Sequence, residues 1–176
     1  MAYPVFLYKK SDDLLLFNSR RQNKIFGTMY RCEIPYNGIT FTSSEQMYKY
    51  LLFDGNPEIQ ETILKYGKYE PHAAKAIGVA MYEEINWKRR IELFGKTILY
   101  KTKYCKRFRD ALIGTGDKIL IEYNYWSDEP TVFTCKDSED GDGYVGTNMH
   151  GRILMRIREH LLDGTFDEWS KEFMYI

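Results

Sequence analysis

The sequence predicts an α+β fold: a single, mainly helical domain with short N-terminal hairpin strands and a small antiparallel sheet. Capping residues and apolar spacings of three and four recur along most of the chain and indicate helices. Short apolar runs near the N-terminus and after the longest helix indicate strands. A chain of 176 residues can build one core, and no interior stretch rich in Pro, Gly or Ser separates two, so we expect residues 1–176 to form one domain.

Composition excludes a disordered chain, because 44% of the residues are hydrophobic and 16% are aromatic. The many rings could also stack on a planar ligand, although most are expected in the core. Cys32, Cys105 and Cys135 are widely spaced, which indicates neither a disulfide framework nor a zinc site and fits a reducing compartment. With neither a signal pattern nor a membrane-spanning apolar run, we expect a cytoplasmic protein without a membrane partner. We also expect the protein to be a monomer.

The formal net charge is zero, which removes the simplest argument for non-specific nucleic-acid binding. The charges are unevenly distributed, however, because Trp87–Ile113 is strongly basic and Thr115–Gly143 is strongly acidic. The acidic loop Lys136–Gly143 invites a calcium interpretation, but Asn148 stands where a calcium loop beginning at Asp137 needs its bidentate glutamate. We therefore expect no metal site there.

Short strands are expected first. Pro4–Tyr8 and Leu14–Phe17 are apolar runs of strand length. Met29–Ile34 and Ile39–Phe41 flank Asn37-Gly38, and an Asn-Gly pair between apolar runs is a strong hairpin signal.

The predicted hairpin delivers the chain to a helix that carries a carboxylate in its first turn. Thr42–Ser44 supplies good N-cap residues, and Thr42 with Glu45 or Ser43 with Gln46 has capping-box spacing. Glu45 shares a helix face with Tyr48 and Leu52, so it is expected to face the interior. A buried carboxylate would be costly unless paired, although the helix dipole favours its charge. The alternative is a solvated glutamate that only closes a capping box.

Further helices follow. Asn56 as N-cap, Pro57 at the first helical position and Gly67 beyond the end frame one helix, and Pro71–Ile77 predicts a short one. A long helix begins at Trp87, with an inward stripe of Trp87, Ile91, Phe94, Ile98, Cys105, Phe108 and Leu112. Lys101 fills the one gap in this stripe. Its ammonium either reaches water along the surface or requires an anionic partner, which could be Glu45 or a ligand phosphate.

The last third of the chain is predicted to contain a strand pair and two helices. A turn at Gly114–Asp117 precedes a strand at Lys118–Tyr125, whose expected partner is Thr131–Cys135. Gly146–Asn148 then caps a helix at Met149–Leu162, and the free N–H groups at its start could hold an anion. A short closing helix carries Phe166, Trp169 and Phe173.

Taken in order, these motifs resemble the NADAR family, also called YbiA-like. The resemblance covers roughly residues 25 to 162. The matching pieces are Gly38, Ser44-Glu45, Trp87, Lys101, Leu112–Asp117, Leu120-Ile121-Glu122 and Gly146–Arg158. The chain departs from the family pattern after the Leu-x-Glu strand, where Asn124–Thr131 supplies Asp128 but no Trp-Gly, and Trp126 is the ring that could stand in. It departs again where Gly27–Met29 and Lys49–Leu52 replace Ser-Asn-Phe and Gln-Ala-x-Lys. A viral or phage origin would fit the short chain and the acidic loop.

The resemblance implies an N-glycosidase that cleaves a bond between ribose C1 and a nitrogen. Several family members remove ADP-ribose from guanine bases in DNA, and we expect this chain to act on an ADP-ribosylated nucleobase. Ribosyl transfer passes through an oxocarbenium-like state, which a fixed carboxylate stabilises while a second group handles the proton. The resemblance implies Glu45 as the first of these catalytic groups and Asp128 as the second.

The resemblance also implies a set of substrate-binding residues: Ser44, Trp87, Lys101, Thr115, Gly116, Trp126, Gly146 and Asn148. Lys101 and the helix start at Gly146–Asn148 would hold a pyrophosphate, Trp87 would stack on a base, and Thr115-Gly116 would allow close approach of the backbone. No cofactor or metal is expected. Two alternatives remain open: a glycosidase of phosphorylated ribosylamino-pyrimidine intermediates related to riboflavin synthesis, and a non-catalytic module that binds ADP-ribose or nucleic acid.

Overall fold

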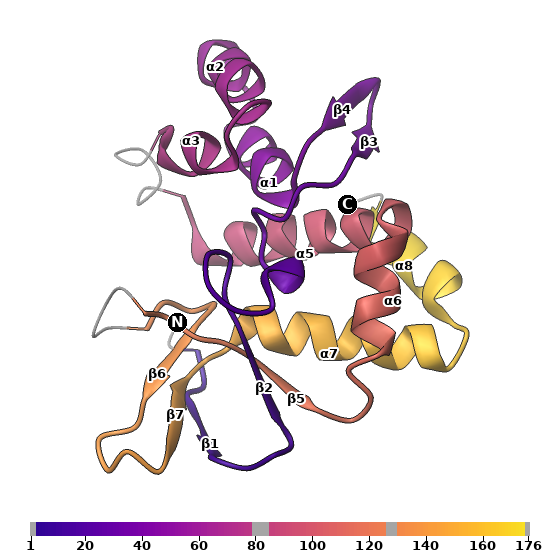
Figure 1. Ribbon diagram of the computed structural model, residues 1–176. Coiled ribbons are helices and arrows are strands. Elements are labelled where there is room, and N and C mark those ends of the chain that lie inside the picture. Colours follow the sequence, from indigo (N-terminus) through magenta and orange to yellow (C-terminus); the bar gives the residue numbers. More distant parts are fainter. Residues whose placement is uncertain (1–2, 79–84, 126–129, 175–176) are drawn as a thin grey trace. The chain divides into compact units, whose positions relative to one another are not determined.

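The computed structural model describes residues 3–78, 85–125 and 130–174, and it shows the predicted α+β fold of helices with small sheets (Figure 1). The contacts divide the chain into two compact units. The first consists of Met1–Gly27 and Ala111–Phe166, and the second of Thr28–Asp110 and Asp167–Ile176. Across the described ranges, no helix is both long and apolar enough to cross a membrane.

Three strands of the first unit form an antiparallel sheet in the order β1-β7-β6. Their bounds are Phe6–Lys9 for β1, Cys135–Asp137 for β6 and Gly143–Gly146 for β7. Strand β7 is central, since Gly146 aligns with Phe6 on one side and with Cys135 on the other. Residues 138–142 of the acidic loop therefore connect the β6–β7 hairpin, and the prediction of a small antiparallel sheet is confirmed.

Two further strands in the described part of this unit pair in parallel, with Leu14–Phe17 (β2) aligned along Ile119–Glu122 (β5). The prediction that β5 pairs with Thr131–Cys135 is wrong, apart from one isolated bridge between Tyr123 and Cys135. Both paired strands are apolar, and α7 packs on β5. The pairing of β2 with β5 thus buries two apolar runs together. This burial is favoured over pairing of β5 with Thr131–Cys135, which is closer in the sequence.

Helix α7, Met149–Leu162, has the bounds predicted from the sequence. Its buried side chains Leu154 and Ile157 belong to the core of the first unit, where Phe17, Leu120 and Ile121 are also fully buried. The spacing of three between the two helix residues places both on the face that packs against β5.

The second unit opens with the predicted Asn-Gly hairpin, formed by Ile34–Tyr36 (β3) and Ile39–Phe41 (β4) (Figure 1). Asn37 and Gly38 both adopt positive φ angles, of 47° and 78°, as a two-residue turn of the I′ type requires. The first strand lies later than predicted, because only Ile34 of the expected run Met29–Ile34 joins the ladder, together with Pro35 and Tyr36. The preceding residues leave the ladder, and Cys32 contributes a single backbone hydrogen bond to Thr42.

Three helices follow the hairpin, and side chains cap each of them. Ser43 caps α1 (Ser44–Leu52), Asn56 caps α2 (Pro57–Gly67) and Glu70 caps α3 (Pro71–Ala76). The predicted positions of these helices are confirmed, with Pro at the first position of both α2 and α3.

The predicted long helix is broken into α5 (Trp87–Tyr104) and α6 (Lys106–Ile113) at Cys105. Cys105 has an extended backbone, with φ −102° and ψ 90°, although its N–H group still donates to the carbonyl of Lys101. The prediction of one continuous helix is therefore wrong. Neither Pro nor Gly stands at the break, so no helix-breaking residue accounts for it. The closing helix is α8, Phe166–Met174.

Candidate functional site

Glu45 lies in the first turn of α1 and faces the interior, as predicted, with 6% of its surface exposed. The hydroxyl of Thr28 donates a 2.6 Å hydrogen bond to Oε2 of Glu45, and the N–H group of Glu45 donates to the carbonyl of Thr28 at 3.0 Å. The hydroxyl of Ser44 donates to the same carbonyl at 3.0 Å. Glu45 is thus held by hydrogen bonds at both its backbone N–H group and its carboxylate.

The alternative of a solvated glutamate that closes a capping box is wrong. The N-cap is Ser43, whose hydroxyl accepts from the N–H of Gln46 at 3.2 Å. Gln46 returns the contact with Oε1, which accepts from the N–H of Thr42 at 2.8 Å, while its Nε2 donates to the carbonyl of Ile63. Because Ser43 caps the helix and Gln46 reaches back to Thr42, neither of these contacts uses the side chain of Glu45.

A buried lysine accompanies Glu45 on the same helix face, one turn later. Lys49 is 4% exposed. Burial lowers the pKa of Lys49 from 10.5 to about 8; the charge of Glu45 opposes this shift, and the charges of Lys75 and Arg90 add to it. Sequence reasoning missed Lys49, although its spacing of four from Glu45 was the available signal.

Trp87, the predicted base-stacking residue, begins α5 and is 40% exposed. The guanidinium of Arg90 lies 4.1 Å from the centroid of the Trp87 ring, a cation–π contact. Arg90 is itself buried and acts electrostatically on Lys49. The second unit therefore gathers a tryptophan, an arginine, a lysine and a fixed carboxylate on α1 and α5.

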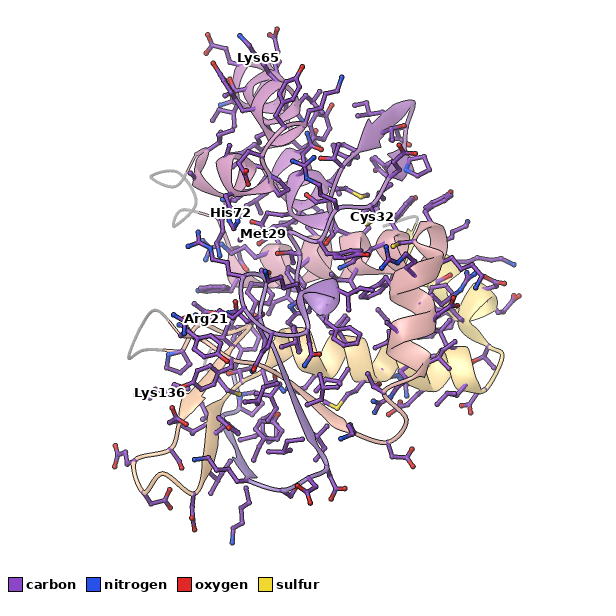
Figure 2. The ribbon with its side chains drawn as sticks, in the orientation of Figure 1. Arg21, Met29, Cys32, Lys65, His72 and Lys136 are labelled. Atoms are coloured by element: carbon purple, nitrogen blue, oxygen red, sulfur yellow. The ribbon has the colours of Figure 1, made fainter. Side chains whose placement is uncertain are left out.

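Lys101 does not extend to water, because it is fully buried. Its ammonium lies 4.2 Å from the ring centroid of Phe108 and 5.5 Å from that of Tyr30. Burial lowers the pKa of Lys101 to about 8, and electrostatic interaction with the thiols of Cys32 and Cys105 opposes this shift. Figure 2 labels Cys32, just before the hairpin. The structure thus associates Lys49 with Glu45, and the binding role of Lys101 stays a prediction.

In the first unit, Asn148 joins α7 to β5 through its side chain. Nδ2 donates to the carbonyl of Leu120 at 2.8 Å, and Oδ1 accepts from the N–H of Glu122 at 3.1 Å. Asn148 is fully buried at the N-cap with a φ of 51°, and the hydroxyl of Tyr8 also hydrogen-bonds to it. Both ends of the amide are therefore occupied within the protein.

The predicted anion cradle at the start of α7 is occupied by protein carbonyls at two positions. The N–H of Met149 donates to the carbonyl of Val132 at 3.1 Å, and that of His150 to the carbonyl of Phe133 at 3.4 Å. Gly146 lies in β7, where a Cβ would approach the carbonyl of Thr134 to 2.3 Å. The glycine is thus required for sheet packing, whatever its role toward a ligand.

The turn with Thr115 and Gly116 is held by a buried arginine. Arg158 donates to the hydroxyl of Thr115 at 2.7 Å and to the carbonyl of Lys118 at 2.8 Å, while the Thr115 hydroxyl donates to Leu112. Gly116 adopts the left-handed conformation, with φ 55°. The side chain of Thr115 is therefore engaged in the turn.

Sequence reasoning also left Glu122 and His150 unassigned, although both fall in the quoted motifs. Nδ1 of His150 lies 3.0 Å from Oε2 of Glu122, and the rings of Phe17 and His150 form a T-shaped pair with centroids 5.0 Å apart. His150 is fully buried and the Glu122 side chain is 15% exposed. The predicted residues Asp128 and Trp126 lie outside the described residues. Among the described ones, no group of three or more His, Cys, Asp or Glu side chains is placed to hold a metal ion.

Comparison with known families and proteins gives a consistent assignment. The family described as NADAR domain matches residues 6–162. A protein of Vibrio vulnificus (strain YJ016) named a riboflavin biosynthesis protein is 27% identical over 171 residues, which cover 92% of this chain and 39% of that protein. The chain thus spans about two fifths, 39%, of the length of the curated relative it matches.

The NMR structure of the E. coli protein YbiA has a similar fold. It matches with a TM-score of 0.58 and 19% identity, over 89% of this chain and 90% of that one. The expected YbiA-like fold is confirmed.

Proposed function

Because the chain belongs to the NADAR family, whose members are generally N-glycosidases, we propose that it hydrolyses the bond between ribose C1 and a nitrogen. The proposed substrate is an ADP-ribose conjugate, specifically an ADP-ribosylated guanine in DNA. The observation that carries the proposal is the buried carboxylate of Glu45, which Thr28 anchors by a 2.6 Å hydrogen bond.

A fixed carboxylate suits the chemistry of this bond. As the C1–N bond lengthens, positive charge develops on the ribose ring, and a nearby anion that is already oriented lowers the energy of that state. The bonding electrons leave with the nitrogen, which takes a proton, and water adds to C1 to give free ADP-ribose. Thr28 keeps the carboxylate from rotating, so little reorganisation is needed as charge develops.

The reaction also requires a proton donor or a base, for which the sequence offers Asp128. The cations near Glu45 support an anionic substrate. Lys49 and Arg90 are buried in the same unit as Glu45, and both carry charges that a pyrophosphate would complement. Trp87 presents an exposed indole suitable for stacking on a base.

The decisive variant is Glu45→Gln, which keeps the shape and the ability to accept from Thr28 while removing the charge. Release of ADP-ribose from modified DNA, followed by chromatography, should fall at least about a hundredfold, with the melting temperature nearly unchanged. Glu58→Gln is the matched control, because Glu58 occupies the corresponding second position of α2 but is exposed. Undiminished release by Glu45→Gln would contradict the proposal.

A second candidate is hydrolysis of a phosphorylated ribosylamino-pyrimidine. It is favoured by the name of the Vibrio vulnificus relative, a riboflavin biosynthesis protein. Both substrates present a C1–N bond and phosphate, so the same groups would serve. Parallel incubations separate them, because the first substrate yields ADP-ribose and the second yields ribose 5-phosphate.

A further inference from the structure

Three tyrosines of the second unit form a continuous row of rings, which we call the tyrosine ladder. Tyr36 of β3 meets Tyr100 of α5 edge to face, with centroids 5.2 Å apart and an interplanar angle of 83°. Tyr100 stacks with Tyr104 of the same helix, at 6.1 Å and 28°. The row begins half-buried at Tyr36 and ends at Tyr104, which is 44% exposed.

The inner end of the ladder is held firmly. Tyr36 and Tyr100 pack against the buried cluster of Ile34, Phe41 and Met47. Their rings therefore lose little further freedom if a ligand stacks beside them, which lowers the entropic cost of binding.

Lysines accompany the rings at both ends of the ladder. The ammonium of Lys96 lies 5.4 Å from the centroid of Tyr36, and that of Lys103 lies 5.6 Å from the centroid of Tyr104. Lys96, Tyr100 and Lys103 follow at spacings of four and three, so they share one face of α5. Glu92 lies four residues before Lys96 on α5, and no further acidic residue occurs in the sequence before Asp110.

Aromatic rings beside ammonium groups are features that single-stranded nucleic acid can use, and Tyr104 is the exposed ring of these three. Every base has a π face that can stack on tyrosine, and the backbone carries one negative charge per nucleotide. In a duplex the base faces are already stacked on one another, so they are not available to the ladder.

We propose that the tyrosine ladder, with Lys96 and Lys103, binds single-stranded nucleic acid without sequence preference. The bases stack on the tyrosine rings, and the phosphates meet the two ammonium groups. This binding goes beyond the glycosidase activity and does not require cleavage.

Fluorescence anisotropy with a labelled oligothymidylate of 20 nucleotides tests the inference. Tyr104→Ala should weaken binding by at least about fivefold, the lower limit for loss of one stacked base. The double variant Lys96→Gln with Lys103→Gln should also reduce the slope of log affinity against log salt by about 1.4, for two phosphate contacts on a single strand. The same sequence as a duplex should bind at least about tenfold more weakly than the single strand.

The matched control is Tyr66→Ala on α2. Tyr66 is 52% exposed and has the ammonium of Lys65 5.3 Å from its ring centroid, so it offers the same chemistry outside the ladder. Figure 2 labels Lys65 on α2. Tyr66→Ala should leave the affinity within about twofold of the starting protein.

Three results would overturn the inference: no binding at low salt, an affinity of Tyr104→Ala equal to that of Tyr66→Ala, or tighter binding of the duplex. Circular dichroism of each variant excludes misfolding as the cause of a loss. Glu45→Gln should bind the oligonucleotide as the natural chain does. Normal ADP-ribose release without oligonucleotide binding would refute only the proposal that the tyrosine ladder binds nucleic acid. Normal oligonucleotide binding without ADP-ribose release would refute only the proposed glycosidase activity.

Discussion

Thr28 and Glu45 hold each other through two hydrogen bonds of opposite direction. The Thr28 hydroxyl donates to the carboxylate at 2.6 Å, and the Glu45 N–H donates to the Thr28 carbonyl at 3.0 Å. Thr28 precedes the β3–β4 hairpin and Glu45 follows it, so this pair joins the two ends of the segment that the hairpin occupies. The position of the carboxylate therefore depends on a residue 17 positions earlier in the chain.

Thr28→Val should remove the hydroxyl while keeping the shape of the side chain. We expect the free energy of unfolding to fall by about 1.5–3 kcal/mol, as for other hydrogen bonds to charged groups. The kcat for ADP-ribose release should fall roughly tenfold or more, because the carboxylate can then leave its productive orientation. Urea denaturation and steady-state kinetics measure the two effects. Thr28→Ser, which restores a hydroxyl, should recover most of both, and a kcat of Thr28→Val within about twofold of normal would contradict the positioning role.

Lys49 should give the activity an alkaline limit. Burial lowers the pKa of Lys49 to about 8, so its ammonium is lost from the folded protein as the pH rises through that value. If the ammonium holds an anionic substrate near Glu45, kcat/KM should decrease above about pH 8. Lys49→Arg keeps its charge throughout this range and should remain active at pH 9. A profile of kcat/KM from pH 6.5 to 10 tests this, with Lys65→Arg as a surface control. If Lys49→Arg shows the same decrease of kcat/KM at alkaline pH, the decrease comes from a group other than Lys49.

Lys101 should lower stability at neutral pH. Its pKa is about 8 in the folded protein against 10.5 for an ordinary lysine, so between these values the unfolded chain binds more protons and stability rises with pH. Below pH 8 the full cost of the buried charge remains. Lys101→Met should therefore be more stable than the natural chain at pH 7, by on the order of 1–3 kcal/mol, and this advantage should disappear near pH 10.5.

Thermal or urea unfolding at pH 7 and pH 10.5 checks the Lys101→Met prediction. Because Lys101 is fully buried, we also expect KM to stay within about twofold of normal for this variant. A tenfold rise in KM would instead support the substrate-binding role that the family resemblance implies. Lower stability at pH 7 would show that the aromatic rings and thiols compensate the charge.

Two helical glycines should respond to alanine in opposite directions. A Cβ at Gly151 in α7 would lie 2.1 Å from the carbonyl oxygen of Leu120, so Gly151→Ala must push α7 away from β5. We expect a loss of at least about 2 kcal/mol in the free energy of unfolding. Gly95 in α5 has open space at the same point, and Gly95→Ala should stabilise by about 0.5–1 kcal/mol. Urea denaturation of the two variants side by side tests the pair, and equal effects would contradict the close approach.

Local signals predicted most of the elements. The positive φ angles of Asn37 and Gly38 are what an Asn-Gly turn requires, and Asn56 caps α2 as its sequence indicates. The inward direction of Glu45 also followed from its spacing to Tyr48 and Leu52. These features depend on residues only a few positions apart, so the sequence alone was sufficient for them.

Long-range pairing was not predictable in the same way. Leu14 aligns with Ile119, more than a hundred residues later, and no local pattern indicates this partner. The helix breaks at Cys105 without a Pro or Gly that would have predicted the break from the sequence. Val132 and Phe133 were predicted in a strand, but they lie in a turn, and their carbonyls accept from two N–H groups of α7. The candidate site was accordingly predicted at Glu45, whereas its anchor Thr28 and its companion Lys49 were missed.

The amide of Asn148 discriminates between two side chains of the same shape. Its Nδ2 donates to the Leu120 carbonyl at 2.8 Å, so exchanging that nitrogen for oxygen, as in aspartate, would set two electron-rich atoms against each other in a site without water access. The contact between α7 and β5 is therefore a point at which the exchange of one atom would weaken the first unit without altering its shape.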